Sequence, residues 1–174
     1  MPDPESFKKA KSHALKFLCY RDRSNWELAQ YLKKKEYSHS VIQQTLDYLT
    51  ELNYINDQRF ALQWGQFKIN KNNIGRNRLY MELSGKKINK AIIEKTLNTI
   101  YANYPEKDLA AKCARKKWDS LKGVETEKKK RRLVQFMQRR GFSSDIIYQS
   151  LKTLIESIDT ESNYSFSRST VDQD

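Results

Sequence analysis

A chain of 174 residues that is only 38% hydrophobic, with a mean hydropathy of −0.87, cannot bury one thick globular core. Five Gly and three Pro leave few places for the tight turns of a many-stranded sheet, whereas residues with high helix propensity dominate. The 33 Lys and Arg against 21 Asp and Glu give a net charge of +12, which attracts polyanions. These features predict an all-α protein with an acidic partner such as nucleic acid.

Cysteine usage and the start of the chain indicate a reducing cytoplasm. Cys19 and Cys113 are far apart and lack CxxC spacing, so we expect no disulfide framework or zinc site and two small buried helix residues instead. The chain has no apolar run near the length of a membrane span, and residues 1–5 are acidic where a secretory leader would be basic. We therefore expect a cytoplasmic protein with no membrane contact.

The first predicted helices have apolar residues at helical spacing and polar caps. A first helix is indicated by Ala10, Ala14, Leu15 and Leu18. Ser24 and Glu27 form a capping-box pattern before the next helix, and Ser38 stands where an N-cap would precede the third. Trp26, near the start of the second helix, is expected to face outward, either to stack on a base or partner side chain or to staple the helix start.

The apolar spacing of the second and third helices occurs three times. From Leu28, Leu79 and Leu133, apolar residues or Tyr follow at offsets of 4, 9, 14, 18 and 21. These positions are Leu32, Tyr37, Ile42, Leu46 and Leu49; Leu83, Ile88, Ile93, Leu97 and Ile100; and Met137, Phe142, Ile147, Leu151 and Leu154. Each copy is typical of two amphipathic helices with the residue at offset 9 in their connector. The sequence therefore contains an internal repeat.

A further helix precedes the second and third copies of this pattern. The apolar positions that indicate it are Phe60, Ala61, Trp64 and Phe67, and then Leu109, Cys113 and Trp118, of which both Trp are expected in the core. The prediction is three tandem three-helix repeats stacked into an elongated, curved array. We expect an N-terminal extension at residues 1–9, repeats at 10–56, 57–103 and 104–158, and a disordered acidic tail at 159–174.

Several local motifs accompany the repeat. They are Arg21-Asp22-Arg23-Ser24 with Glu27-Leu28, Asn53-Tyr54-Ile55-Asn56-Asp57 with Phe60-Ala61, Gly75-Arg76, Lys86-Lys87-Ile88, and Arg139-Arg140-Gly141-Phe142. Together these motifs resemble the RecX family. The family usually has Gly before the connector residue, where this chain has Glu36 and Lys87, and only Gly141 follows the pattern. Because Gly favours the left-handed C-cap conformation, we expect the first two connectors to close differently or to accept strain.

The resemblance implies a non-catalytic regulator that binds the RecA recombinase. Members of the family lie in the groove of RecA filaments on DNA and limit ATPase, strand exchange and co-protease activity in recombination and the SOS response. The alternative is an autonomous helical protein that contacts DNA directly without RecA. His13 and His39 have no ligand-spaced partners, and no nucleotide-binding or catalytic motif occurs, so we expect no enzyme activity, metal or cofactor. We expect a monomer.

The candidate DNA- or RecA-binding residues are cations, and the DNA is either single- or double-stranded. They are Lys33, Lys34 and Lys35; Lys68, Lys71, Arg76 and Arg78; Lys86 and Lys87; and Lys128, Lys129, Lys130, Arg131, Arg132, Arg139 and Arg140. Five consecutive cations cannot share one helical face, so some of the last group must only be solvated. Gly75 would let a phosphate approach the backbone or would simply be a loop residue, and lysines at helix ends also complement the macrodipole.

Overall fold

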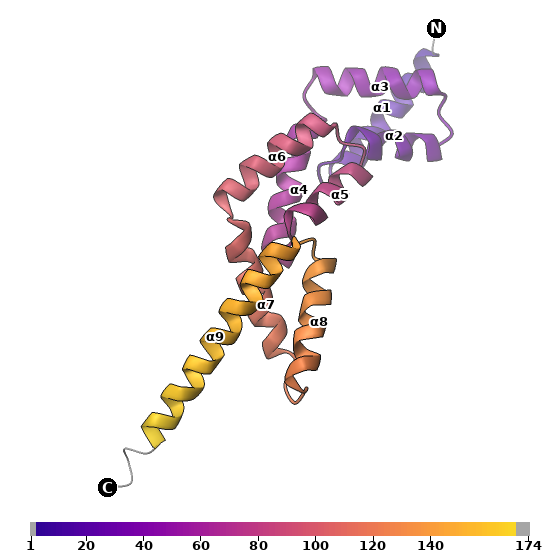
Figure 1. Cartoon of the computed structure of the whole chain (residues 1–174). Helices are drawn as coiled ribbons and strands as arrows, with labels where there is room; N and C mark the ends of the chain where they lie inside the picture. The colour runs from indigo at the N-terminus through magenta and orange to yellow at the C-terminus, as the bar shows by residue number, and fades with distance from the viewer. Residues whose placement is uncertain (1–2, 170–174) are drawn as a thin grey trace. The chain divides into compact units, whose positions relative to one another are not determined.

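The computed structural model describes residues 3–169, with side chains placed up to Thr160. Throughout this part of the chain the regular structure is helical, as predicted (Figure 1). The nine helices described are α1 (Pro4–Leu18), α2 (Asn25–Lys34), α3 (His39–Glu51), α4 (Asp57–Asn72), α5 (Arg76–Gly85), α6 (Lys90–Asn103), α7 (Glu106–Asp119), α8 (Thr126–Arg139) and α9 (Ser144–Ser169). Within residues 3–169, no helix has the length and apolar character that crossing a membrane requires.

The helices form two compact units that divide the chain within its middle third. The first unit contains Met1–Phe67 and Tyr80–Ile100, and the second contains Lys68–Leu79 and Tyr101–Asp174. In the first unit, α1, α2 and α3 pack on one another, and in the second, α7, α8 and α9 do so (Figure 1). Each of α4, α5 and α6 contributes residues to both units.

The hydrophobic core follows the repeated spacing. All eighteen repeat positions are buried or half-buried, and the three starting residues Leu28, Leu79 and Leu133 are each 0% exposed. The caps agree with the sequence as well, since Ser24 and Glu27 form the capping box of α2, and Ser38 accepts a bond from the Val41 N–H. The local pattern therefore fixes which face of each helix is buried.

The three connectors between second and third helices share one conformation. Glu36, Lys87 and Gly141 have φ of 62°, 58° and 83°, in the left-handed region. One residue later, the N–H groups of Tyr37, Ile88 and Phe142 donate to the carbonyls of Leu32, Leu83 and Met137 over 3.4, 3.2 and 3.3 Å. This is the Schellman motif, in which an apolar residue after the left-handed one packs on the last turn of the helix. Glu36 and Lys87 therefore close their connectors in the way that Gly141 does and accept the strain.

The starts of α2 and α5, the second helices of the first two repeats, each dock on the repeat that follows. In the first unit, Ser24 Oγ donates to the Lys86 carbonyl over 3.4 Å, and in the second, the Gly75 N–H donates to the Arg140 carbonyl over 2.8 Å. Ser24 and Gly75 occupy the same repeat position, as do Lys86 and Arg140. We call these two interactions the docking contacts.

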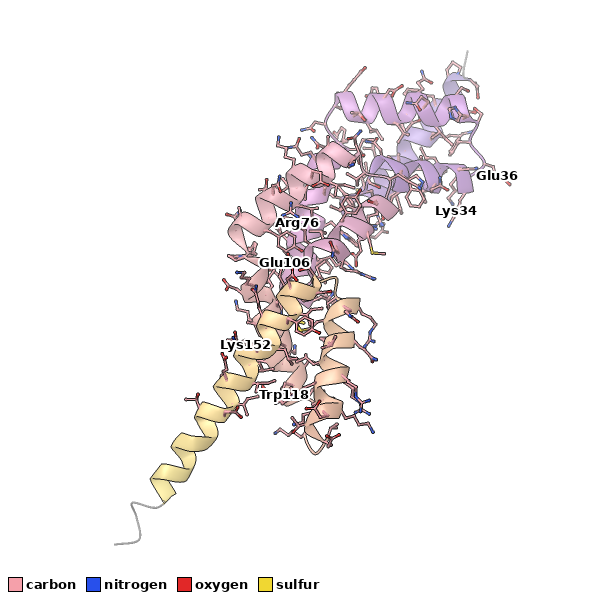
Figure 2. All side chains as sticks on the ribbon, viewed as in Figure 1. Lys34, Glu36, Arg76, Glu106, Trp118 and Lys152 are labelled. Atoms are coloured by element: carbon pink, nitrogen blue, oxygen red, sulfur yellow. The ribbon has the colours of Figure 1, made fainter. Side chains whose placement is uncertain are left out.

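A carboxylate reinforces each docking contact. The Asn25 N–H donates to Asp57 over 2.8 Å, and the Arg76 N–H donates to Glu106 over 2.8 Å, the pair labelled in Figure 2. In both cases the acceptor is the first residue of the next repeat's first helix. The N–H groups at a helix start have no partner within the helix, so these carboxylates satisfy donors that would otherwise be left open.

Both ends of the described chain are more helical than the sequence predicts. Helix α1 begins at Pro4 because Asp3 caps it, so residues 4–9 are part of the helix and not an extension. Helix α9 continues through residues 159–169, where the sequence predicts a disordered tail; this segment contains no Gly or Pro to end the helix. The rest of the predicted tail, residues 170–174, lies outside the described residues.

Cys19 is a further difference from the sequence expectation. Cys113 is buried as expected, whereas Cys19 is exposed. Cys19 is the C-cap residue of α1 and follows Leu18, the last residue of the helix.

Candidate nucleic-acid interface

The outward face of α8 has four exposed cations. At 3.6 residues per turn, Lys128, Arg132 and Arg139 fall nearly on one line along the helix, and Arg131 lies beside them. Leu133 and Met137, on the opposite side, are each 0% exposed. Among the described residues these four cations have no ion pair. We call Lys128, Arg131, Arg132 and Arg139 the basic face.

The other cations of this run are held by neighbouring side chains. Lys130 Nζ lies 2.6 Å from Glu127, and Lys129 Nζ lies 5.1 Å from the centre of the Trp118 ring. Trp118 is therefore half-buried under a cation and not in the core. Some cations of the run from Lys128 to Arg132 are thus exposed to solvent, and others contact neighbouring side chains. In repeat position, Lys129 and Lys130 correspond to Ser24–Asn25 and Gly75–Arg76, the residues that dock in the first two repeats.

Lys86 belongs to a half-buried ion network. Its Nζ lies 2.7 Å from Glu27 Oε1, and the two side chains are 16% and 13% exposed. Arg21 also binds Glu27 over 2.9 Å. Burial raises the pKa of Glu27, but hydrogen bonds from Arg21 and Lys86 outweigh it and lower the pKa to about 2. Lys86 therefore joins two segments of the first unit and is not presented to solvent, whereas its neighbour Lys87 is exposed.

Trp64 lies beside this ion network. The Lys86 Nζ is 4.1 Å from the centre of the Trp64 ring, and the indole N–H of Trp64 donates to Glu82 over 3.0 Å. Like Trp118, Trp64 is half-buried and not a fully enclosed core residue. The indole N–H donates to a carboxylate while the ring face contacts a cation, and both interactions are common for a partly exposed tryptophan.

The cations around residues 68–78 lie on both sides of a loop that leaves no room at Gly75. Lys71 and Arg78 are exposed, while Lys68 and Arg76 are half-buried. A Cβ placed on Gly75 would meet the Gly141 backbone at 2.5 Å. Gly75 is thus a packing residue, and a phosphate has no access to its backbone there.

The remaining candidates are exposed near both ends of α2. Lys33, Lys34 and Lys35 are exposed at its C-terminal end, with Lys34 labelled in Figure 2. This position also complements the helix macrodipole. Trp26 is 38% exposed, and its counterparts in the other repeats, Asn77 and Arg131, are exposed too, which agrees with the predicted outward position.

Sequence reasoning missed two of the cations that the structure gathers around one cavity. Lys116 and Lys117 of α7 line it together with Arg140. The signal was present in the run Arg115-Lys116-Lys117, but its proximity to residue 140 depends on how α7 and α8 pack. The sequence groups Arg140 with Arg139 as a binding candidate, whereas the Arg140 guanidinium turns inward and donates to the Asn72 carbonyl over 2.9 Å.

Comparisons with known proteins identify the family. Models of the first, second and third three-helix domains of RecX match residues 10–49, 56–97 and 105–151. The regulatory protein RecX of Chlorobium phaeobacteroides is 32% identical over 153 residues, which cover 86% of this chain and 96% of that protein. This chain belongs to the RecX family. These matches confirm both the resemblance of the local motifs to this family and the three tandem three-helix repeats.

Other relatives agree with this assignment. The regulatory protein RecX of Bacillus subtilis is 34% identical over 143 residues, which are 82% of this chain and 54% of that protein. The crystal structure of RecX from Lactobacillus salivarius has the same fold, with a TM-score of 0.74 at 24% identity over 86% of this chain and 97% of that one. The relatives are regulatory proteins, so a regulatory role in general follows for this chain.

Proposed function

We propose that this RecX-family protein binds RecA and RecA filaments on DNA and limits their ATPase, strand exchange and co-protease activities. The observation that carries the DNA part is the basic face of α8, because four exposed cations on one helix side can each neutralise a phosphate. The family membership supports the RecA part. We further propose a cytoplasmic monomer that needs no cofactor and catalyses no reaction itself.

The repeated architecture suits a filament as partner. A RecA filament offers the same site at regular intervals, and three linked three-helix repeats of similar structure can engage neighbouring sites. Linking weak contacts in this way raises the overall affinity without any new contact. Exposed cations in each repeat, such as Lys34, Lys87 and Arg132, are suitable for such shared contacts.

The test measures RecA ATPase on single-stranded DNA at moderate salt while this protein is added. Inhibition at amounts well below one protein per RecA supports control of the filament, because few molecules then affect many subunits. Loss of activity only when the DNA itself is coated contradicts it. That result supports the second candidate, an autonomous DNA-binding protein, which the basic face also favours. A RecA pull-down in the absence of DNA provides an independent check.

A further inference from the structure

The second unit contains a cavity with an unusual concentration of positive charge. Its volume is about 180 Å³, and it lies between the end of α4, helix α7 and the end of α8. Four cations line it, namely Lys71, Lys116, Lys117 and Arg140, and none of its lining residues is acidic. The other polar lining groups are neutral. A hollow that gathers cations without carboxylates attracts anions.

Two of these cations are positioned by aromatic and backbone contacts and not by ion pairs. The Arg140 guanidinium donates to the Asn72 carbonyl over 2.9 Å and lies 5.0 Å from the centre of the Phe136 ring. Lys117 Nζ lies 5.4 Å from the same ring. Within the described residues, neither Lys117 nor Arg140 has a carboxylate partner. Phe136 therefore holds two like charges near one another, an arrangement that an anion would stabilise.

The wall of the cavity adds no negative charge. Cys113 lies in it and is 5% exposed. Burial raises the pKa of the Cys113 thiol, and the nearby Arg140 and Lys116 offset this only in part. The thiol is therefore neutral at physiological pH and leaves the positive potential of the cavity intact.

We propose that this cavity binds a phosphate group of single-stranded nucleic acid, with Lys116, Lys117 and Arg140 as its ligands. At roughly 30 Å³ per water molecule, the cavity holds the volume of about six waters, which is ample for a five-atom phosphate group. A flexible single strand can bend one phosphate into such a hollow at a lower deformation cost than a stiff duplex. Arg139 of the basic face directly precedes Arg140, so a strand on that face passes close to the cavity. This inference rests on the proposed DNA binding and gives it a specific site.

The first experiment uses inorganic phosphate as the probe. Melting temperatures of the full chain are compared in sodium phosphate and in sodium chloride at equal ionic strength. A ligand that binds only the folded state raises the melting temperature. We expect phosphate to raise it for the wild type and for the control Lys107→Gln/Lys112→Gln, which removes two exposed α7 charges outside the cavity. Lys116→Gln/Lys117→Gln should lose the increase, and Lys116→Arg/Lys117→Arg should regain it. An equal increase in all four proteins overturns the site.

The second experiment separates a nucleic-acid phosphate from free phosphate. Fluorescence anisotropy of a labelled oligo(dT) measures the affinity of the same variants. Loss of one phosphate contact lowers the salt slope by about 0.7 and the affinity at 0.1 M salt by about fivefold. We expect Lys116→Gln/Lys117→Gln to lose this much more affinity and salt slope than the charge-matched control Lys107→Gln/Lys112→Gln. Equal losses in both variants, with the phosphate effect on melting preserved, mean that the cavity takes free phosphate only and overturn the nucleic-acid assignment. Neither experiment includes RecA, so these results test the cavity independently of whether the protein inhibits RecA.

Discussion

Lys86 Nζ lies 2.7 Å from Glu27 Oε1, and this ion pair connects the capping box of α2 to the connector between α5 and α6. The same ammonium group lies 4.1 Å from the Trp64 ring centre. Lys86 therefore acts as a structural cation, although its sequence context Lys86-Lys87 is that of a solvated binding pair. The ion pair also makes the stability of the first unit depend on pH.

Glu27→Gln should destabilise the protein at neutral pH and much less in acid. The folded-state pKa of Glu27, about 2, lies below its ordinary 4.5, so its contribution is present above pH 4.5 and is lost as the pH falls toward 2. A pKa difference of this size corresponds to roughly 3–3.5 kcal/mol. Urea denaturation of both proteins at pH 7, 4 and 2.5 measures it. A free-energy difference that stays constant over this range would contradict the assigned pairing.

Gly75→Ala and Gly141→Ala should each destabilise the second unit. A Cβ on Gly141 would lie 2.2 Å from the Arg78 backbone nitrogen, and one on Gly75 would lie 2.5 Å from the Gly141 carbonyl carbon. Overpacking of this kind costs about 1–3 kcal/mol, and the positive φ of Gly141 adds about 1 kcal/mol. Gly85→Ala is the matched control, since its Cβ would meet nothing within 4 Å. Because Gly85 is the last residue of α5, the substitution should change the free energy of unfolding by no more than about 0.5 kcal/mol, as measured by urea denaturation.

Glu36→Gly and Lys87→Gly should stabilise the protein. Both residues have a left-handed backbone, with φ of 62° and 58°, which is costly for a residue with a Cβ. Glycine relieves this strain but gains freedom in the unfolded chain, so the expected net gain is about 0.5–1 kcal/mol at each site. Thermal melts of the single and double variants measure it. Glycine at Lys34, the last residue of α2, should instead destabilise, and a loss at all three positions would show that the connectors carry no strain.

Reversing charge on the basic face should weaken DNA binding and flatten its salt dependence. Lys128→Glu/Arg131→Glu/Arg132→Glu removes three exposed cations and leaves Lys129 on Trp118. If all three contact phosphates, the slope of log affinity against log salt should fall by roughly 2–3. The control reverses three exposed lysines elsewhere, Lys90, Lys95 and Lys122. Equal slopes in the two variants would assign the effect to net charge and exclude α8 as the interface.

The sequence predicts what depends on local spacing and misses what depends on distant contacts. The repeat offsets place Leu28, Leu79 and Leu133 in the core because helical periodicity alone decides which face is apolar. Lys86 finds Glu27 across 59 residues of chain, and no local pattern indicates that pairing. Likewise, the sequence around Gly75 is that of an ordinary loop glycine, and only the structure shows that the Gly141 backbone packs against it.

The candidate site divides in the same way. The exposed cations of α8 follow from helical geometry, since the residues opposite Leu133 and Met137 must face solvent. The cavity does not follow, because Lys117 and Arg140 come together only through the packing of α7 and α8 around Phe136. The structure therefore revises the predicted role of Arg140, which turns inward, but leaves Arg139 exposed as the sequence predicts.

The docking contacts can form only in a fixed order during translation. Ser24 meets a carbonyl 62 residues further along the chain, and at about 5–20 residues per second the ribosome needs roughly 3–12 seconds to add that length. Until then the Lys86 carbonyl has not been made, and the hydroxyl of Ser24 donates to water instead. The docking contact of each of the first two repeats thus forms only after the matching connector of the next repeat has been made.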